Sequence, residues 1–320
     1  MDKTPTLSIY FIDVGLSTEN FMNAAHAGRL LVGVPGGRAP EVLLTNQELP
    51  DGIDVSKVSR RIFWTSMGMP KVDNGALFSC DLSGRDIKTV IGRHSILHTP
   101  KQLLVDDQGS KIYVCDREGL KVVRCNPDGS ELEILVTTGD SEDENHRADP
   151  SRWCVGIAVC HRTGKFYWSQ KGPSKGGKGR IFRANIDFLD GENAENRSDV
   201  ECVLQNLPEP INLSIDQERG ELYWTDRGEL PLGNSINRVS IRSLRPIQHG
   251  DQTVSWPGKD YELLVRNMHE AIGIKLDLLN KHIYATDLGG RVYRFGLDGR
   301  NGETFYESQG TYAGITLVWT

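Results

Sequence analysis

Six short segments of this chain repeat one pattern, in which an aliphatic or aromatic pair is followed by two further strand-forming residues and a polar end. They are IYFID at Ile9, IFWTS at Ile62, IYVCD at Ile112, FYWSQ at Phe166, LYWTD at Leu222 and IYATD at Ile283. The segments recur every 50 to 61 residues, and a second strand-like segment follows each one, as in GRIFRANIDF and GRVYRFGLDG. A β-hairpin repeated at this period restricts the chain to architectures built from a series of similar units.

A third strand-like segment precedes five of the six hairpins, for example PKQLLVDDQGS before Ile112 and PINLSIDQERG before Leu222. The matching segment for the hairpin at Ile9 stands at the other end of the chain, as YAGITLVWT. A ring in which the last strand pairs into the first blade explains this displacement, because closure removes open sheet edges between units.

Fourth strands are predicted in IKTVIG, ELEILV, VECVLQ and YELLVR. The sequence therefore predicts an all-β fold, a six-bladed β-propeller with four-stranded blades, forming a single domain over residues 1–320. A β-sandwich or two smaller β domains would explain six register-matched copies less well.

Charge and composition exclude several classes of function. The 37 basic and 43 acidic side chains give a net charge of −6, the wrong sign for a protein held mainly by nucleic-acid phosphates. The chain has no apolar run of the roughly 18 residues that a membrane-spanning helix needs. Its first residues, MDKTPTLSIYFIDVG, do not have the layout of a signal peptide.

The best copy of the repeat, LYWTD from Leu222 to Asp226, resembles the YWTD repeat of low-density lipoprotein receptor propellers, and the likeness runs over nearly the whole chain. Asp116, Asp226 and Asp287 keep the acidic end of the repeat, whereas Ser66 and Gln170 replace it. We expect these carboxylates to accept hydrogen bonds between blades rather than to take part in catalysis.

The connections between strands fall into two sets on opposite faces, because the innermost strand of a blade runs from one face to the other. One set consists of short turns such as DDQGSK and DQERGE. The other set is long and dissimilar, and it comprises residues 14–29, 66–75, 137–153, 170–179, 226–235, 265–273 and 307–314. Connections that vary between repeats carry function more often than uniform turns do, so a site is predicted on the long-loop face.

Aromatic, thioether and imidazole groups are enriched on this face, which suits an apolar organic ligand with a few oxygens. Loop packing explains any single one of these side chains better than ligand binding does, so the prediction depends on their combined enrichment. The substrate-binding candidates are Phe21, His26, Met67, Met69, Trp153 and Met268, with Met22 and His94 on the same face. The catalytic candidates, as donors to a substrate oxygen, are His269, Tyr312 and His98.

Other polar motifs give weaker signals. Lys171, Lys175 and Lys178 do not follow the order of a phosphate-binding loop, and the acidic residues from Asp140 to Glu144 do not have the spacing of a calcium-binding EF-hand loop. Both segments are interpreted as solvated loops, and no metal or other cofactor is predicted. The six cysteines form no CxxC pair, which leaves their redox state open.

Two N-x-S sequons place glycosylation candidates at Asn196 and Asn212, and Asn196 lies in the more polar stretch. If they are used, the protein passes through the secretory pathway or is extracellular; the alternative is the cytoplasm.

Three functions remain open. Some calcium-dependent lactonases have a similar propeller outline, and Asn212 is a candidate ligand for such an ion. The YWTD receptors imply instead a propeller that binds proteins. In length and repeat layout the chain also resembles the fungal hetero-Diels-Alderases, propellers that join a tropolone-derived o-quinone methide to a humulene-type sesquiterpene.

The third resemblance is favoured because a cycloaddition needs two oriented partners and a hydrogen-bond donor, but no nucleophile and no metal. It implies small hydrophobic substrates, a tropolone and a terpene, and it leaves open whether the protein is a monomer or a dimer.

Overall fold

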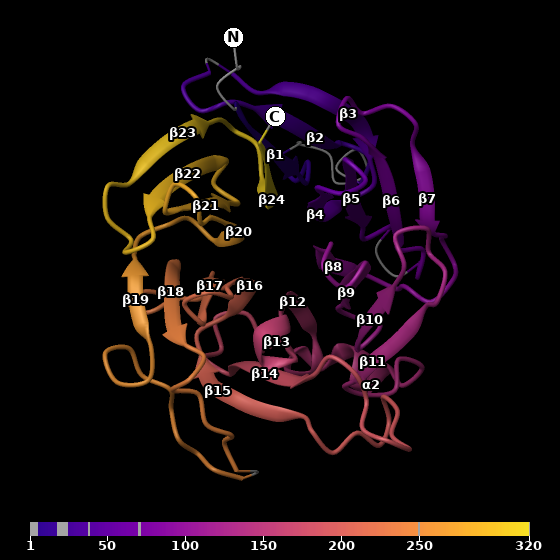
Figure 1. Cartoon of the computed structure of the whole chain (residues 1–320), viewed down its shortest axis with the longest axis vertical. Coiled ribbons are helices and arrows are strands. Elements are labelled where there is room, and N and C mark those ends of the chain that lie inside the picture. Colours follow the sequence, from indigo (N-terminus) through magenta and orange to yellow (C-terminus); the bar gives the residue numbers. More distant parts are fainter. Residues whose placement is uncertain (1–5, 18–24, 38, 70–71, 249, 320) are drawn as a thin grey trace.

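The computed structural model describes residues 6–17, 25–37, 39–69, 72–248 and 250–319, whose strands form six four-stranded antiparallel sheets around a central axis (Figure 1). From the axis outward, blade 1 consists of β24 (Tyr312–Trp319), β1 (Leu7–Asp13), β2 (Gly28–Gly33) and β3 (Glu41–Gln47). Blade 2 consists of β4 (Pro50–Ser56), β5 (Arg61–Ser66), β6 (Ala76–Asp81) and β7 (Lys88–Ile91). Blade 3 consists of β8 (Pro100–Asp106), β9 (Lys111–Asp116), β10 (Lys121–Cys125) and β11 (Glu133–Thr137).

The other three blades follow the same order. Blade 4 consists of β12 (Cys154–Cys160), β13 (Lys165–Gln170), β14 (Gly179–Asn185) and β15 (Glu201–Leu207). Blade 5 consists of β16 (Pro210–Asp216), β17 (Glu221–Asp226), β18 (Ser235–Ser240) and β19 (Glu262–Val265). Blade 6 consists of β20 (Ala271–Asp277), β21 (His282–Asp287), β22 (Arg291–Gly296) and β23 (Glu303–Glu307). The predicted six-bladed propeller is confirmed.

Ring closure also occurs as predicted. β1 pairs with β2 on one side and with β24 on the other, and Ile9 lies opposite Leu317. The chain therefore supplies the inner strand of its first blade from its other end, which Figure 1 shows beside β1.

The second strand of each blade supplies the aromatic core. Consecutive side chains of a strand point to opposite faces, so neighbouring residues pack into different gaps between blades. Tyr223 packs with Ile274 and Ile283 of blade 6, whereas Trp224 packs with Ala158 and Tyr167 of blade 4. The aromatic pair of the repeat thus fills both gaps beside its own blade.

A hydroxyl group near the end of the repeat ties adjacent blades together. In blade 5 this hydroxyl belongs to Thr225, which lies beside an irregular part of the inner strand, where the register shifts between Pro210 and Leu213. Thr225 Oγ1 accepts from the Asn212 N–H at 3.2 Å and donates to the Ile272 carbonyl of blade 6 at 2.6 Å. Thr65 and Ser169 form the same pair of bonds, each accepting from its own blade and donating to a carbonyl of the next blade.

The carboxylates that end the repeat accept hydrogen bonds from backbone N–H groups. Asp226 Oδ1 accepts from the N–H groups of Glu209 and Gly228, both at 2.9 Å, and Asp116 accepts from those of His98 and Thr99. Glu209, His98 and Thr99 lie in the connections that join each blade to the preceding one. These carboxylates therefore accept hydrogen bonds where two blades are linked, as expected.

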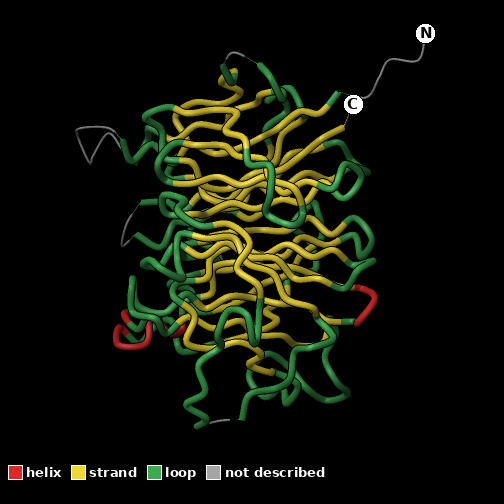
Figure 2. The backbone as a smooth tube through the Cα atoms, turned by 90° about the vertical axis from the view of Figure 1, so that its left-hand side faces the viewer, coloured by secondary structure: helices red, strands yellow, loops and turns green. Residues whose placement is uncertain are grey.

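The two faces of the ring differ, as Figure 2 shows in side view. The helix α2 (Glu144–Ala148) precedes β12 on the long-loop face, and the 3-10 turn His161–Thr163 follows β12 on the opposite face. This opposite face is not uniformly short, because residues 186–200 and 241–261 form long connections there. The second of these covers the edge of β15, where Ile247 N donates to Cys202 O at 2.8 Å.

Candidate functional site

A cavity of about 970 Å³ opens at the long-loop end of the central channel, which we call the wide end. Its lining is half apolar and half charged. The apolar part includes Val14, Leu16, Leu49, Met67, Trp153, Ile272, Leu288 and Ala313, and the charged part includes Asp51, Asp73, Lys101, Arg117, Glu118, Glu144, Arg147 and Arg227. The structure thus places a cavity of ligand size on the face where the sequence predicts a site.

Lys101 and Asp51 form the polar floor of this cavity. Both occupy the second position of an inner strand, where the other blades have Val155, Ile211, Ile272 and Ala313. Lys101 Nζ lies 2.5 Å from Asp51 Oδ2 and 3.2 Å from Met67 Sδ. Burial lowers the pKa of Lys101, and the Asp51 carboxylate opposes this effect.

The third N–H of the Lys101 ammonium has no partner within the described part of the chain. A thioether is only a weak acceptor, so the Asp51 carboxylate is the one strong partner of this cation. Lys101 lines the cavity, and it can therefore donate a hydrogen bond to an oxygen of a bound molecule.

A hydrogen-bonded pair of amides crosses the channel below this floor. Asn212 Nδ2 donates to Gln102 Oε1 at 3.0 Å, and Gln102 Nε2 donates to Asp51 Oδ1 at 2.6 Å. These two residues stand at the third position of the inner strands of blades 3 and 5, where the other four blades have glycine. They separate the wide end from the opposite, narrow end of the channel, and we call them the channel partition.

Trp153 forms one wall of the cavity and is held on several sides. Its indole N–H donates to the Arg147 carbonyl at 2.7 Å. The Arg117 guanidinium lies 5.0 Å and the Lys171 ammonium 5.2 Å from the ring centroid, within the range of cation–π attraction. The ring is therefore a fixed apolar surface with positive charge beside it.

Ion pairs surround the mouth of the cavity. Arg117 pairs with Glu118 at 2.5 Å, and Arg147 of α2 pairs with Asp73 at 3.1 Å. The second of these contacts joins residues 137–153 to the connection between β5 and β6, so it partly covers the cavity. Arg227 binds the buried carboxylate of Glu209 at 2.9 Å. Acidic and basic side chains at the mouth therefore compensate each other, so the mouth is polar but has almost no net charge.

The structure brings together some of the predicted site residues. Met67 and Trp153 line the cavity. His98 is near the rim, with Nδ1 3.0 Å from Asp73 Oδ1, while Met69 is half-buried and outside the lining.

The other predicted residues lie elsewhere or outside the described residues. His26, His94 and His269 are exposed, Met268 packs in the core between blades 5 and 6, and Phe21 and Met22 fall outside the described ranges. Tyr312 is 2% exposed and packs edge-on against Phe11, and its hydroxyl bonds to Ser308 Oγ at 2.7 Å. Its hydroxyl is thus engaged by the exposed connection at Ser308, and Tyr312 is not among the residues that line the cavity.

The basic and acidic loops are largely exposed, as predicted, with Lys171 as the exception. Lys171 is buried against Glu209 at 2.8 Å, whereas Lys175 forms a surface pair with Glu229. Lys178 is exposed. In the acidic segment, Asp143 caps α2 by accepting from Asn145 N at 2.8 Å.

The two glycosylation candidates differ sharply in exposure. Asn196 is exposed on residues 186–200, as expected for an acceptor site. Asn212 is buried in the channel partition, and the amide nitrogen that would carry the sugar donates to Gln102. A glycan at Asn212 does not fit this fold.

Three further observations concern metal ligands, cysteines and membrane spans. Across the described residues, no group of three or more His, Cys, Asp or Glu side chains is arranged to hold a metal ion. All six cysteines carry free thiols, and burial raises the pKa of Cys154 to about 12. The described helices include none that is long and apolar enough to cross a membrane.

Sequence reasoning missed the polar floor of the cavity. The signal was present in the repeat itself, because an alignment of the six inner strands shows Asp51 and Lys101 at an otherwise apolar position. Arg117 and Arg227 each follow directly after a repeat segment, and only Arg227 lies in one of the long connections, residues 226–235.

The fold and this cavity define a YWTD-type six-bladed β-propeller. A scan against models of known protein families found no match. The chain is similar to solved structures of a nidogen/laminin complex (TM-score 0.68, 18% identity, 97% of this chain and 98% of that chain) and of TolB from Acinetobacter baumannii (TM-score 0.63, 11% identity, 97% and 66%). These two likenesses concern the fold alone.

Two fungal relatives are closer in sequence. The chain is 39% identical to a Pyricularia oryzae protein named low-density lipoprotein receptor-related protein 1, over 99% of this chain and 100% of that protein. It is 42% identical to the 3-hydroxyacyl-CoA dehydrogenase-like protein LAM1 of Cochliobolus heterostrophus, over 97% of this chain, and spans 64% of the length of that relative. The chain belongs to the family of the Pyricularia protein.

Proposed function

We propose that this protein is a pericyclase of fungal secondary metabolism that binds two small, largely apolar molecules in the wide-end cavity. The proposed reaction is a stereoselective hetero-Diels–Alder cycloaddition between a tropolone o-quinone methide and a humulene-type sesquiterpene. The single observation that supports it best is the combination of a cavity of about 970 Å³, an apolar wall and a buried ammonium donor on its floor.

The reaction needs little from the protein beyond orientation and charge stabilisation. In the cycloaddition one C–O bond and one C–C bond form, the π bonds of the heterodiene and the alkene are rearranged, and every atom of both partners is kept. Electron density moves toward the oxygen of the quinone methide as the bonds form. A donor placed at that oxygen lowers the barrier, and a rigid cavity decides which faces of the two partners meet.

Lys101 has the geometry for this donor. It is held by Asp51 at the cavity floor and retains one unpartnered N–H among the described residues. Trp153, Met67 and Leu288 provide the apolar surface against which the terpene and the tropolone ring would pack. In this proposal Lys101 takes the role that the sequence assigned to His269, Tyr312 and His98.

The experiment is incubation of the purified protein with a quinone-methide precursor and humulene, with and without EDTA, followed by chiral chromatography of the products. We expect a single enantiomer in both conditions. Replacement of one such donor, as in Lys101→Met, should lower the rate about 10²- to 10³-fold. Lys175→Met removes an exposed lysine of the same face and should leave the rate unchanged.

The racemic background product alone would overturn the proposal. Turnover of lactones that stops on addition of EDTA would then favour the calcium-dependent alternative, although Asn212 is engaged by Gln102 and no set of ligands is found in the described residues. Binding of a protein ligand without turnover would favour a role like the one that the name of the Pyricularia relative implies. A dehydrogenase activity has no support in this chain, which lacks a Rossmann glycine fingerprint.

A further inference from the structure

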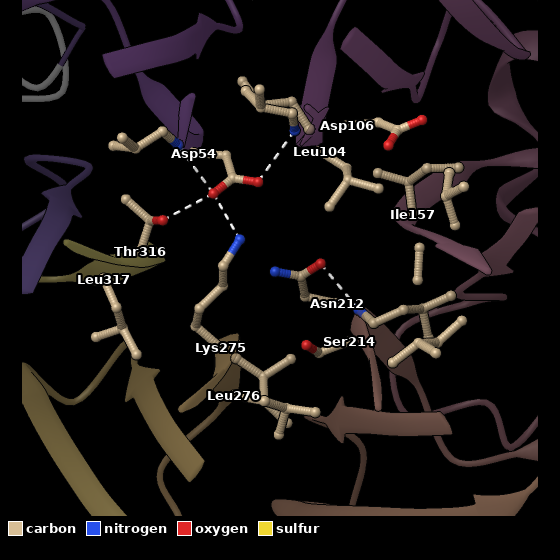
Figure 3. A pocket seen from close by; sticks show the side chains of 18 of the residues that line it. Asp54, Leu104, Asp106, Ile157, Asn212, Ser214, Lys275, Leu276, Thr316 and Leu317 are labelled. Carbon is tan, nitrogen blue, oxygen red and sulfur yellow. Dashed lines mark hydrogen bonds and ion pairs between the residues drawn. The ribbon is translucent and has the colours of Figure 1, made fainter. Parts of the chain in front are cut away.

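A second cavity, of about 340 Å³, opens at the narrow end of the channel, on the face opposite the site described above. It is lined by the far ends of the six inner strands, and Figure 3 shows it from close by. Many of the residues that line it are aliphatic, including Leu104, Ile157, Leu276 and Leu317, while polar groups supply more than half of its exposed wall. The channel partition limits its depth, because Asn212 belongs to both the partition and the lining.

Asp54 is the buried anion of this cavity, and its charge is well compensated. Its carboxylate accepts from Val55 N at 2.9 Å, Val105 N at 3.0 Å, Thr316 Oγ1 at 2.7 Å and Lys275 Nζ at 2.5 Å. Three of these four donors are independent of Lys275. The carboxylate would therefore stay hydrogen-bonded if the ammonium shared its charge with a ligand.

Lys275 and Ser214 offer the free donors. Lys275 Nζ bonds only to Asp54 within the described ranges, so two of its three N–H groups have no protein partner. The Ser214 hydroxyl likewise has no hydrogen-bond partner in the described part of the chain. Figure 3 shows both side chains reaching the same space from the neighbouring strands β20 and β16.

The remaining charged groups at this mouth are already engaged or point to solvent. Both oxygens of Asp106 lie 2.8 Å from His161 Nε2. Asp107 accepts from Ser56 Oγ at 2.6 Å and from Lys57 N at 2.7 Å, and Lys57 itself is exposed. Lys275 is thus the cation that faces the interior of the cavity.

We propose that the narrow end is a second ligand site, which binds a short aliphatic carboxylate. The carboxylate accepts hydrogen bonds from Lys275 and Ser214, and the hydrocarbon chain lies against Leu104 and Leu276. Charge-assisted bonds to an ammonium are stronger than bonds between neutral groups, so the ammonium favours an acid over an alcohol of the same length. This site is independent of the proposed cycloaddition, because the partition and the opposite face separate the two.

The test is titration of the whole protein with hexanoate, with hexanol as the neutral counterpart, by isothermal calorimetry. We expect saturable binding of hexanoate and about tenfold or more weaker binding of hexanol. Lys275→Met should weaken hexanoate binding by a similar factor, and Ser214→Leu, which fills the cavity, should abolish it. Trp153→Ala at the wide end and Lys175→Met on the surface should bind hexanoate as the natural protein does.

Three results would overturn the proposal: no saturable binding to the folded natural protein, equal binding of hexanol and hexanoate, or unchanged binding to Lys275→Met. Near-UV circular dichroism establishes that each variant is folded. If Lys275→Met does not fold, Ser214→Ala takes its place, since it removes one donor without changing a charge and should still weaken hexanoate measurably. Failure here leaves the cycloaddition untouched, because that reaction is measured with other substrates at the other end.

Discussion

The two ends of the central channel are built from the same six strands but by different means. At the wide end, long connections, α2 and several ion pairs surround a large cavity, whereas at the narrow end the strands themselves line a small one. Only the cavity at the wide end is lined mainly by connections whose length differs from blade to blade. The difference indicates that the residues of the inner strands determine both the scaffold and the shape of the narrow-end cavity. The loops, in contrast, adapt the wide-end cavity to a ligand.

The strongest test of this contrast is the removal of Asp54, which connects four inner strands at the narrow end. Asp54→Leu leaves the partly exposed Lys275 ammonium and the Thr316 and Val105 donors without their acceptor. An unsatisfied buried donor costs about 1–3 kcal/mol, and two are left here, so the free energy of unfolding should fall by more than about 2 kcal/mol. Equilibrium unfolding in urea measures it, and a loss below about 1 kcal/mol would show that the narrow end contributes little to the scaffold.

The channel partition that divides the two ends should show direct energetic coupling. Gln102→Ala and Asn212→Ala each remove one partner of the 3.0 Å bond, and each leaves the other amide without it. A double-mutant cycle should give a coupling energy of about 0.5–3 kcal/mol. Additive effects of the two substitutions would mean that the amides do not interact across the channel in solution.

The face of the wide end should also carry a pH dependence of stability that originates at Asp226. Burial raises the pKa of Asp226 to about 7, and the nearby Glu209 carboxylate adds to this effect. The folded protein therefore binds this proton more tightly than the unfolded chain does. Its contribution to stability is fully present below the pKa of an unfolded aspartate and is lost as the pH rises through about 7.

Asp226→Asn tests this origin, because its carbonyl oxygen can still accept from Glu209 and Gly228 while its amide replaces an oxygen that has no partner in the described structure. The fall in urea midpoint between roughly pH 5 and pH 8 should become shallower in the variant than in the natural protein. If the urea midpoint falls equally in both proteins, groups other than Asp226 cause the pH dependence of stability.

The smallest effect is expected at the rim of the wide end. Lys175 and Glu229 pair at 2.7 Å, but both side chains are more than half exposed. Water screens such a pair, so Glu229→Gln should leave the urea midpoint unchanged within error. A measurable loss would show that the rim is part of the scaffold and would weaken the distinction between loops and strands.

Much of this molecule was predictable from local pattern. The alternation of side chains in LYWTD and its relatives predicted the second strands, and the displaced YAGITLVWT predicted how the ring closes. The outer strands β3 and β23 were missed, since segments such as EVLLTNQ are exposed along most of their length and have no clear apolar face. Met67 and Trp153 were found at the cavity because they stand in unusually long connections.

The sequence by itself determined the number of blades, their order, the closing strand and the face with variable loops. These features depend on strand periodicity and on spacing, which are properties of neighbouring residues. Only the tertiary structure decided that Tyr312 packs in the core, that Lys101 meets Asp51, and that Asn212 reaches Gln102 across the axis. The two polar contacts join residues that are 50 and 110 positions apart in the sequence. The direction of the Tyr312 side chain is set by an irregular strand pairing. A pattern of neighbouring residues contains no information about either of these.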